Sequence, residues 1–219
     1  MRQALRPKPK ILLTGFDAFG GGSLNPSWLV VKELNGRQIA GHRVVAAQLP
    51  TLFGESLHRL QALLQQHQPA LVICLGQAGG RRAILLERVA INVNDAPLAD
   101  NAGSQPVDTP VVPGAPAAYF TTLPIKAMLE ALQREGVAVE VSQTAGIFVC
   151  NHVFFGLMHA LATQPTLRHS RGGFVHVPHV PEQGTPNMAQ GEMVRGLRLA
   201  LRSVLRADAD VTLGAGAAH

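Results

Sequence analysis

Apolar runs and amphipathic stretches alternate along most of this chain. The apolar runs are nearly continuous, as in strands that are buried on both faces of a sheet. The predicted strands cover residues 10–16, 42–50, 70–80, 81–95, 137–146 and 172–180. The stretches between them have apolar residues at helical spacing, or the end signals of helices. The predicted helices cover residues 25–36, 53–69, 121–136, 150–163 and 185–206.

Helix end signals support several of these boundaries. Asn25 can cap the first helix, Pro26 suits its first turn, and Gly36 closes it. Pro69 stops the second helix, and Gly136 stops the third. Local sequence therefore agrees with the hydrophobic pattern about where helices begin and end.

Alternation of strands with helices predicts the fold class. We expect a single α/β domain, with a twisted, mostly parallel sheet and helices on both of its faces. Residues 11–206 would form this domain, residues 1–10 a basic N-terminal extension, and residues 207–219 a disordered tail. The loop at 96–118, rich in Pro, Gly, Asp and Asn, is longer than usual, so it is either functional or organised by tertiary contacts.

Composition narrows the class of protein. The chain has 219 residues, 47% hydrophobic and 15% charged, which is typical of a soluble globular protein. Its net charge is +5, but aromatic residues are only 5%, and they do not interleave with basic residues as in a nucleic-acid surface. We therefore expect no nucleic-acid partner. No apolar run is long enough for a membrane span or a signal peptide, so no membrane contact is expected.

Cysteine content bears on both location and chemistry. Two cysteines, Cys74 and Cys150, exclude a disulfide framework and a Cys-rich zinc site. We expect a cytoplasmic protein with reduced thiols. His176 and His179 form an HxxH pattern, but two histidines without a further ligand are a weak metal signal, so no metal and no cofactor are predicted.

The segment GIFVCNHVFFG suggests a nucleophile. It places Cys150 at the start of a predicted helix, where the helix dipole stabilises a thiolate; the alternative is a packed core thiol. A nucleophilic cysteine needs a nearby histidine, and His176 ends an apolar strand at the same expected edge. His152 follows Cys150 too closely to share its helix face. Glu87 lies in an apolar run and must be paired when buried, with Arg88 or with a site residue.

A glycine-rich turn, TGFDAFGGG, follows the first strand. It lacks the GK[ST] ending of a phosphate loop, and its glycines do not fit GxGxxG. Phe16 and Phe19 flank the turn instead. They would either form an apolar pocket for a flat, neutral group or pack in the core.

Six ordered motifs resemble the pyroglutamyl peptidase I family, also called pyrrolidone carboxyl peptidases. They are GFDAFGG with NPSW, GQAGGRRAILLERVAIN, DN-G-QP-D at 100–108, YFTTLPIKAM, AGIFVCNH and GGFVHVPHVPEQ. Together they span about residues 11 to 200. The resemblance implies an α/β fold with a twisted sheet between helices, assembled as a cytosolic homotetramer. It also implies a cysteine peptidase that acts on peptides with N-terminal pyroglutamate.

The resemblance also assigns roles to residues. Cys150, His176 and Glu87 match the family's catalytic Cys-His-Glu set, which needs no metal. The pyroglutamate pocket would draw on Phe16, Phe19, Asn25, Thr51, Gln77, Phe148 and Val149.

Three positions depart from the family pattern. Ala18 stands where proline is common, and Ile147 where threonine is common; both changes look tolerable. Pro97 stands where the family commonly has an arginine near the oxyanion, and Arg81, Arg82 or Arg88 could compensate. Pro97 leaves an alternative: a catalytically impaired relative that binds pyroglutamyl ligands without turnover.

Overall fold

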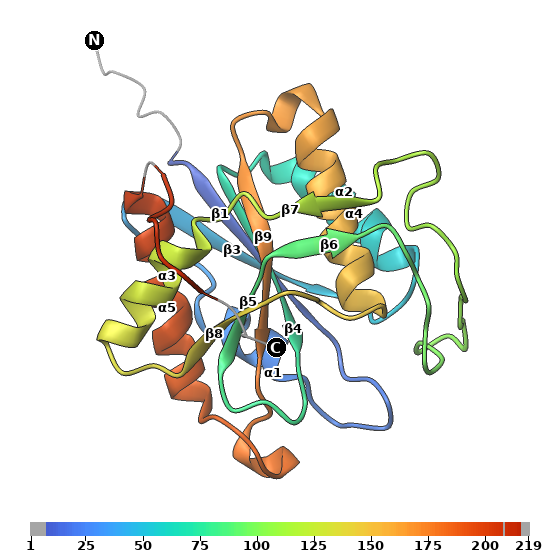
Figure 1. The fold of residues 1–219 in the computed structure, drawn as a ribbon, viewed down its shortest axis with the longest axis horizontal. Helices are drawn as coiled ribbons and strands as arrows, with labels where there is room; N and C mark the ends of the chain where they lie inside the picture. The colour runs from blue at the N-terminus through green and yellow to red at the C-terminus, as the bar shows by residue number, and fades with distance from the viewer. Residues whose placement is uncertain (1–7, 208, 216–219) are drawn as a thin grey trace.

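A seven-stranded sheet forms the centre of the computed structural model, which describes residues 8–207 and 209–215 (Figure 1). Its strand order is β2-β3-β1-β4-β9-β5-β8. The strands are β1 (Lys10–Phe16), β2 (Gln38–Ile39), β3 (His42–Leu49), β4 (Leu71–Gln77), β5 (Ile84–Glu87), β8 (Val139–Ser142) and β9 (Arg171–Val177). Two short strands, β6 (Val89–Ile91) and β7 (Ala118–Phe120), pair separately.

Helices cover both faces of the large sheet, as predicted. The helices are α1 (Pro26–Glu33), α2 (Glu55–His67), α3 (Ile125–Arg134), α4 (Val149–Thr163) and α5 (Gln190–Arg206). Helices α1, α3 and α5 pack together on one face, and α2 packs on α4 on the other (Figure 1). Each face has its own apolar core, built around Ile73 and Leu86 on one side and around Cys74 and Phe174 on the other.

Parallel pairing dominates the sheet, which confirms the predicted class. Strands β3, β1, β4 and β9 run parallel to one another, and the short edge strand β2 pairs antiparallel with β3. Strand β5 departs from this pattern, because it pairs antiparallel with β9 and parallel with β8. The carboxyl ends of β1, β3, β4 and β9 therefore meet at one edge of the sheet, where α/β proteins bind their ligands.

The segment 81–95, which was predicted to be extended, forms two separate strands in the structure. β5 joins the large sheet, and after Arg88 the chain leaves it to form β6, which pairs antiparallel with β7. The long loop between β6 and β7 extends away from the sheet (Figure 1). Its residues are held by an antiparallel bridge between Asn94 and Thr109.

Two predicted helices begin later than expected. α3 begins at Ile125 rather than 121, because the hydroxyls of Thr121 and Thr122 both donate to the Gly172 carbonyl and hold the preceding segment against β9. α5 begins at Gln190 rather than 185. The Met188 amide donates to the carbonyl of His179, which holds the residues before α5 in a non-helical bridge.

The two ends of the chain contain the residues that the structure does not describe. Residues 1–7 of the basic extension, and residues 208 and 216–219 of the predicted disordered tail, lie outside the described residues. Residues 209–215 have no helix or strand, yet Asp210 accepts hydrogen bonds from the amides of Lys126 and Ala127 at the start of α3. None of the helices in the described ranges is long and apolar enough to cross a membrane.

Candidate active site

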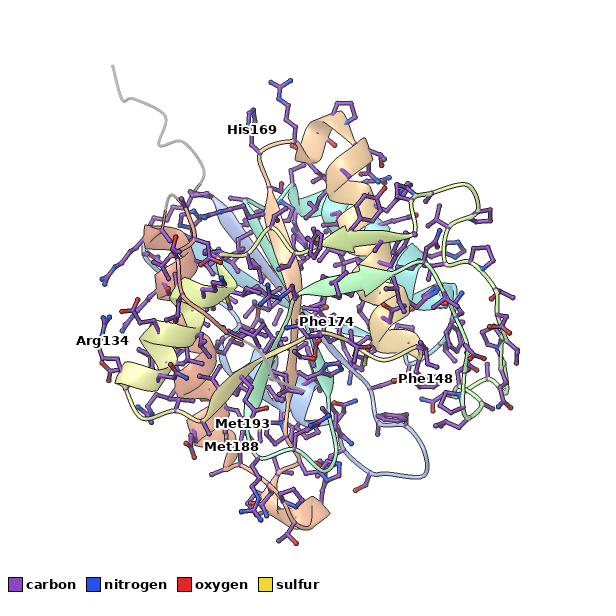
Figure 2. All side chains as sticks on the ribbon, in the orientation of Figure 1. Arg134, Phe148, His169, Phe174, Met188 and Met193 are labelled. Atoms are coloured by element: carbon purple, nitrogen blue, oxygen red, sulfur yellow. The ribbon has the colours of Figure 1, made fainter. Side chains whose placement is uncertain are left out.

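The alternation of side chains along β9 directs His176 toward α4. Val175 and Val177 belong to the core on the α1, α3 and α5 side, so Phe174 and His176 face the opposite side, toward α2 and α4. Figure 2 shows Phe174 at the centre of the molecule, on this strand. His176 is 6% exposed, next to the last residue of the strand.

The antiparallel β5 brings Glu87 to the same face. Leu85 pairs with His176, so Glu87 is a diagonal neighbour of His176 across the two strands. The Glu87 Oε1 atom lies 2.7 Å from His176 Nδ1, and the carboxylate is fully buried. Of the two partners that the sequence left open for Glu87, the structure shows a site residue, and Arg88 instead donates to the carbonyl of Ala215. Glu87 therefore fixes the orientation of the His176 ring and leaves Nε2 free for another partner.

A glycine on β4 leaves room for Cys150. Gly76 pairs with His176, and an ideal Cβ on Gly76 would lie 2.7 Å from Cys150 Sγ and 3.0 Å from His176 Cδ2. Cys150 is the second residue of α4 and is half-buried. The helix thus begins at Val149, as the sequence predicts within one residue, and its first turn brings the thiol within hydrogen-bonding reach of His176.

Electrostatics at this cluster favour a charged His176. Burial by itself would lower the pKa of the imidazole, but the adjacent Cys150 and Glu87 raise it well above its usual value of 6.5. The second carboxylate oxygen of Glu87 has no hydrogen-bond partner among the described residues, so the hydrogen bond to His176 is the one that holds this carboxylate there. The arrangement stabilises an imidazolium beside Cys150, which is the state that accompanies a thiolate.

Cys74 lies on the same strand as Gly76 but differs in its environment. It is fully buried, and burial raises the pKa of its thiol to about 12. A thiol with this pKa is not a nucleophile at neutral pH. The two cysteines are therefore chemically distinct, and both are free.

A narrow recess opens beside Cys150. It contains about 230 Å³ of empty space, including its open mouth. The predicted pocket residues all line it, together with Cys150: Phe16, Phe19, Asn25, Thr51, Gln77, Phe148 and Val149. The structure thus brings every predicted site residue together at one edge of the sheet, with Glu87 and His176 directly behind the thiol.

Hydrogen bonds fix the polar part of the recess. Asn25 caps α1 by accepting from the Ser27 amide, and its Nδ2 donates to the carbonyl of Asp17. The Asp17 carboxylate accepts from both the amide and the hydroxyl of Thr51, each at 2.7 Å. Asp17, which the sequence analysis did not single out, therefore joins the loops after β1 and β3.

Aromatic rings form the apolar part. Phe148, at the start of α4 and labelled in Figure 2, lies 6.1 Å from Phe19 between ring centroids. It also makes an edge contact with Phe53 at 5.4 Å. Phe16 lies deeper and packs on Phe174 at 6.5 Å. Of these rings, Phe16, Phe19 and Phe148 line the recess and give it an apolar wall.

Gln77 is held by the segment after β9. Its amide nitrogen lies 3.1 Å from His179 Nε2, and its oxygen accepts from Gln183. His179 of the HxxH pattern thus orients Gln77.

Among the described residues, no group of three His, Cys, Asp or Glu side chains is arranged to hold a metal ion.

The long loop is anchored next to the recess. The Asp100 carboxylate accepts from the amides of Phe53, Ala102 and Ser104. Burial opposes its ionisation, but these backbone amides lower its pKa below the usual value. Asp100 therefore holds the loop in place.

Pro97 is exposed on the same loop, and Arg81 and Arg82 are also exposed.

Three residues near the site were missed or left aside by sequence reasoning. Gly76 could have been found, because a glycine inside an apolar strand indicates a close approach of another group. Asp17 carried no local signal, since its partner Thr51 is 34 residues away. His152 was correctly expected to face away from Cys150, but its own contacts required the tertiary structure.

Comparisons with known proteins agree with this geometry. The family model described as pyroglutamyl peptidase matches residues 9–207. The chain is 53% identical to pyrrolidone-carboxylate peptidase 1 of Ralstonia nicotianae, over 96% of this chain and 100% of that protein. It is also 53% identical to pyrrolidone-carboxylate peptidase of Klebsiella pneumoniae, over 95% and 99%.

Solved structures show the same likeness. The crystal structure of pyroglutamyl peptidase I from Bacillus amyloliquefaciens has a TM-score of 0.91 and 45% identity, covering 95% of this chain and all of that one. A mutant pyrrolidone carboxyl peptidase from Pyrococcus furiosus has a TM-score of 0.86 and 36% identity, covering 90% of this chain and 98% of that one.

Proposed function

Because this chain belongs to the pyroglutamyl peptidase family, we propose that it is a cysteine peptidase that removes pyroglutamate from the N-terminus of peptides. The observation that carries the proposal is the arrangement of Glu87 and His176 behind Cys150, which lines the recess. A nucleophile, a base and a group that orients the base are the minimum for this chemistry.

The recess suits the proposed substrate group. Pyroglutamate is a flat, neutral lactam without an α-ammonium charge. Within the described part of the chain, the residues that line the recess include no Asp or Glu, so nothing there would select an N-terminal ammonium. Phe16, Phe19 and Phe148 provide apolar contact, and backbone or amide groups at Asn25 and Gln77 supply the few polar partners that a lactam needs.

The proposed reaction proceeds through a thioester. His176 Nε2 takes the proton of the Cys150 thiol, and the sulfur attacks the carbonyl carbon that follows the lactam ring. His176 then protonates the leaving amine as the C–N bond breaks. Water attacks the thioester while His176 takes one of its protons, and the C–S bond breaks to release pyroglutamate. His176 then returns the proton to the sulfur, which restores the thiol. Glu87 holds the ring through Nδ1 and stabilises the imidazolium.

Oxyanion stabilisation is proposed to come from the start of α4. The first amides of a helix have no carbonyl partner within it, so in this proposal those next to Cys150 donate to the oxyanion that forms on the reacting carbonyl. This would reduce the need for an arginine at Pro97. Of the nearby arginines, Arg88 already donates to the Ala215 carbonyl.

We also propose a cytoplasmic location and assembly as a homotetramer. Support for the tetramer comes from the family resemblance, and support for the location comes from that resemblance and from the two free thiols. Sedimentation analysis of the purified protein would give the number of subunits directly.

Release of a fluorophore from a pyroglutamyl amide tests the proposed activity. Prolyl and glutamyl amides serve as substrate controls, and Cys150→Ala serves as the nucleophile control. We expect turnover of the pyroglutamyl amide alone, abolished in Cys150→Ala, whose melting curve should stay close to that of the wild type.

A folded wild-type protein with an alkylatable Cys150 but no turnover would contradict the proposal. It would favour the binding-only alternative that Pro97 raises, which the comparisons do not support. Turnover that persists in Cys150→Ala would place the nucleophile elsewhere.

A further inference from the structure

A second buried histidine, His152, lies on α4 two residues after Cys150 and is 5% exposed. Its Nε2 atom accepts a hydrogen bond from the Gly54 amide at 3.1 Å, and its Nδ1 atom lies 2.9 Å from Asn94 Oδ1. A backbone amide can only donate, so Nε2 carries no proton and the ring is the neutral Nδ1–H tautomer. The Asn94 oxygen is then the matching acceptor.

Both partners of His152 belong to segments that shape the site. Gly54 ends the turn that begins with Thr51, which lines the recess. Asn94 pairs through its backbone with Thr109, at 2.7 and 3.1 Å, and so organises the long loop. His152 thereby ties the loop after β3 and the loop after β6 to the helix that carries the nucleophile.

Ring packing extends this connection to the recess. Phe53 makes an edge contact with His152, at 5.4 Å between centroids and 79° between planes. The same Phe53 ring makes an edge contact with Phe148, which lines the recess. Two contacts therefore connect His152 to the wall of the recess. The hydrogen bond from Gly54 holds the turn that contains Thr51, and the Phe53 ring connects His152 to Phe148.

His152 does not take part in the chemistry itself. Both ring nitrogens are occupied, and burial lowers the pKa of the ring to about 4, so it neither accepts nor supplies a proton at neutral pH. His176, by contrast, has Nε2 free for the thiol. His176 and His152 therefore have different roles: His176 can exchange a proton with the thiol, and His152 cannot.

We propose that His152 is a positioning residue that holds the 51–54 turn and the Phe53 and Phe148 rings at a fixed place relative to Cys150, and so sets the affinity of the recess for the lactam ring. The proposal rests on the proposed function, since it names what positions that substrate. The first turn of α4 thus holds the attacking sulfur, and the residue that fixes the pocket wall lies two positions after Cys150 on the same helix.

His152→Phe tests the proposal, because it keeps the ring packing and removes both hydrogen bonds. Loss of the bond to Gly54 leaves a buried amide unpaired, and we expect KM to rise about tenfold. We expect kcat to stay within about twofold, because Cys150, His176 and Glu87 are unchanged. His152→Gln can accept from the Gly54 amide through its side-chain oxygen, so it should recover most of the affinity.

His159→Phe is the matched control. His159 lies on the same helix, and its Nδ1 atom is 3.0 Å from the Tyr119 hydroxyl, away from the recess. This variant also removes a histidine hydrogen bond from α4. We expect its KM to equal that of the wild type, which would separate the effect on the recess from a general weakening of the helix.

A readout without turnover separates this proposal from the proposed function. 2-Pyrrolidone, the neutral lactam ring without the carbonyl that Cys150 would attack, should protect Cys150 from alkylation by iodoacetamide. The concentration for half-protection should rise about tenfold in His152→Phe, with the same unprotected alkylation rate. If the wild type binds 2-pyrrolidone but does not hydrolyse the amide substrate, the proposed activity fails while the role of His152 stands.

Several results would overturn the proposal. Unchanged KM and unchanged protection in His152→Phe would show that the wall does not depend on His152. A large loss of kcat at constant KM would place His152 in the chemistry, and an equal rise of KM in His159→Phe would show a nonspecific effect. If His152→Phe does not fold, ring ¹⁵N shifts of the wild type decide: an Nε2–H tautomer contradicts the hydrogen bond from Gly54.

Discussion

Gly76 and Cys150 are complementary: the thiol of Cys150 lies where a side chain on Gly76 would be. An ideal Cβ at position 76 would be 2.7 Å from Sγ, closer than van der Waals contact allows. It would also press on Phe174 and on the His176 ring, at 2.9 and 3.0 Å. The absence of a side chain at position 76 of the central strand β4 thus leaves the space that the Cys150 thiol occupies.

Gly76→Ala should therefore impair catalysis more than folding. The added methyl group displaces Sγ or the His176 ring, and a misplacement of about 1 Å lowers kcat roughly a hundredfold. Steady-state kinetics with a pyroglutamyl amide measure the loss. Gly191→Ala is the control, because a Cβ there meets nothing within 4 Å. Full activity in Gly76→Ala would mean that Cys150 has more freedom than the packing implies.

Glu87→Gln should lower the reactivity of Cys150. The substitution keeps the shape and a hydrogen-bonding group but removes the negative charge that helps to raise the pKa of His176. The imidazolium is then less stable, so the proton returns to the thiol and the thiolate fraction falls. We expect kcat to drop by a factor on the order of 10² or more.

The pH profile of Cys150 alkylation provides the check on Glu87. At neutral pH the wild type should be alkylated faster than Glu87→Gln, because the charge of Glu87 helps to raise the pKa of His176. An identical profile in both proteins would show that the buried carboxylate does not act on the histidine.

Native alkylation should distinguish the two cysteines. Cys150 is half-buried beside His176, whereas burial raises the pKa of Cys74 to about 12. Iodoacetamide at pH 7.5 should modify one thiol per chain, and peptide mass spectrometry should locate it at Cys150. Unfolded protein, in which both thiols are accessible, is the control. Preferential modification of Cys74 would contradict the assignment of the nucleophile.

Acid should destabilise the protein partly through His152. Burial lowers the pKa of this ring from 6.5 to about 4, so between these pH values the unfolded chain binds a proton that the folded chain does not. Stability therefore rises with pH across this window and is lost as pH falls from about 6.5 toward 4. The loss amounts to about 3 kcal/mol.

Denaturant unfolding at several pH values measures this dependence. The slope between pH 4 and pH 6.5 should be smaller in His152→Phe, which has no titrating group at this position. Equal slopes in the two proteins would mean that the folded chain protonates His152 as readily as the unfolded one does.

Local sequence determined the elements and the kinds of residue at the site. Apolar runs, caps and helix stops gave the strands and helices to within a few residues, because these signals act between near neighbours. The motif around Cys150 indicated a nucleophile at a helix start, and the structure has α4 beginning at Val149. The boundaries of α3 and α5 were wrong, because side chains and backbone from other elements hold the residues before them.

Tertiary structure alone decided how these residues meet. Glu87 reaches His176, 89 residues away, only because β5 runs antiparallel to β9, and no local pattern specifies the direction of that pairing. Likewise, the partners of His152 lie 98 and 58 residues away, at Gly54 and Asn94. Sequence periodicity reports which face of an element is buried; which residues share that face depends on strand order and register, and these are fixed only when the whole chain packs.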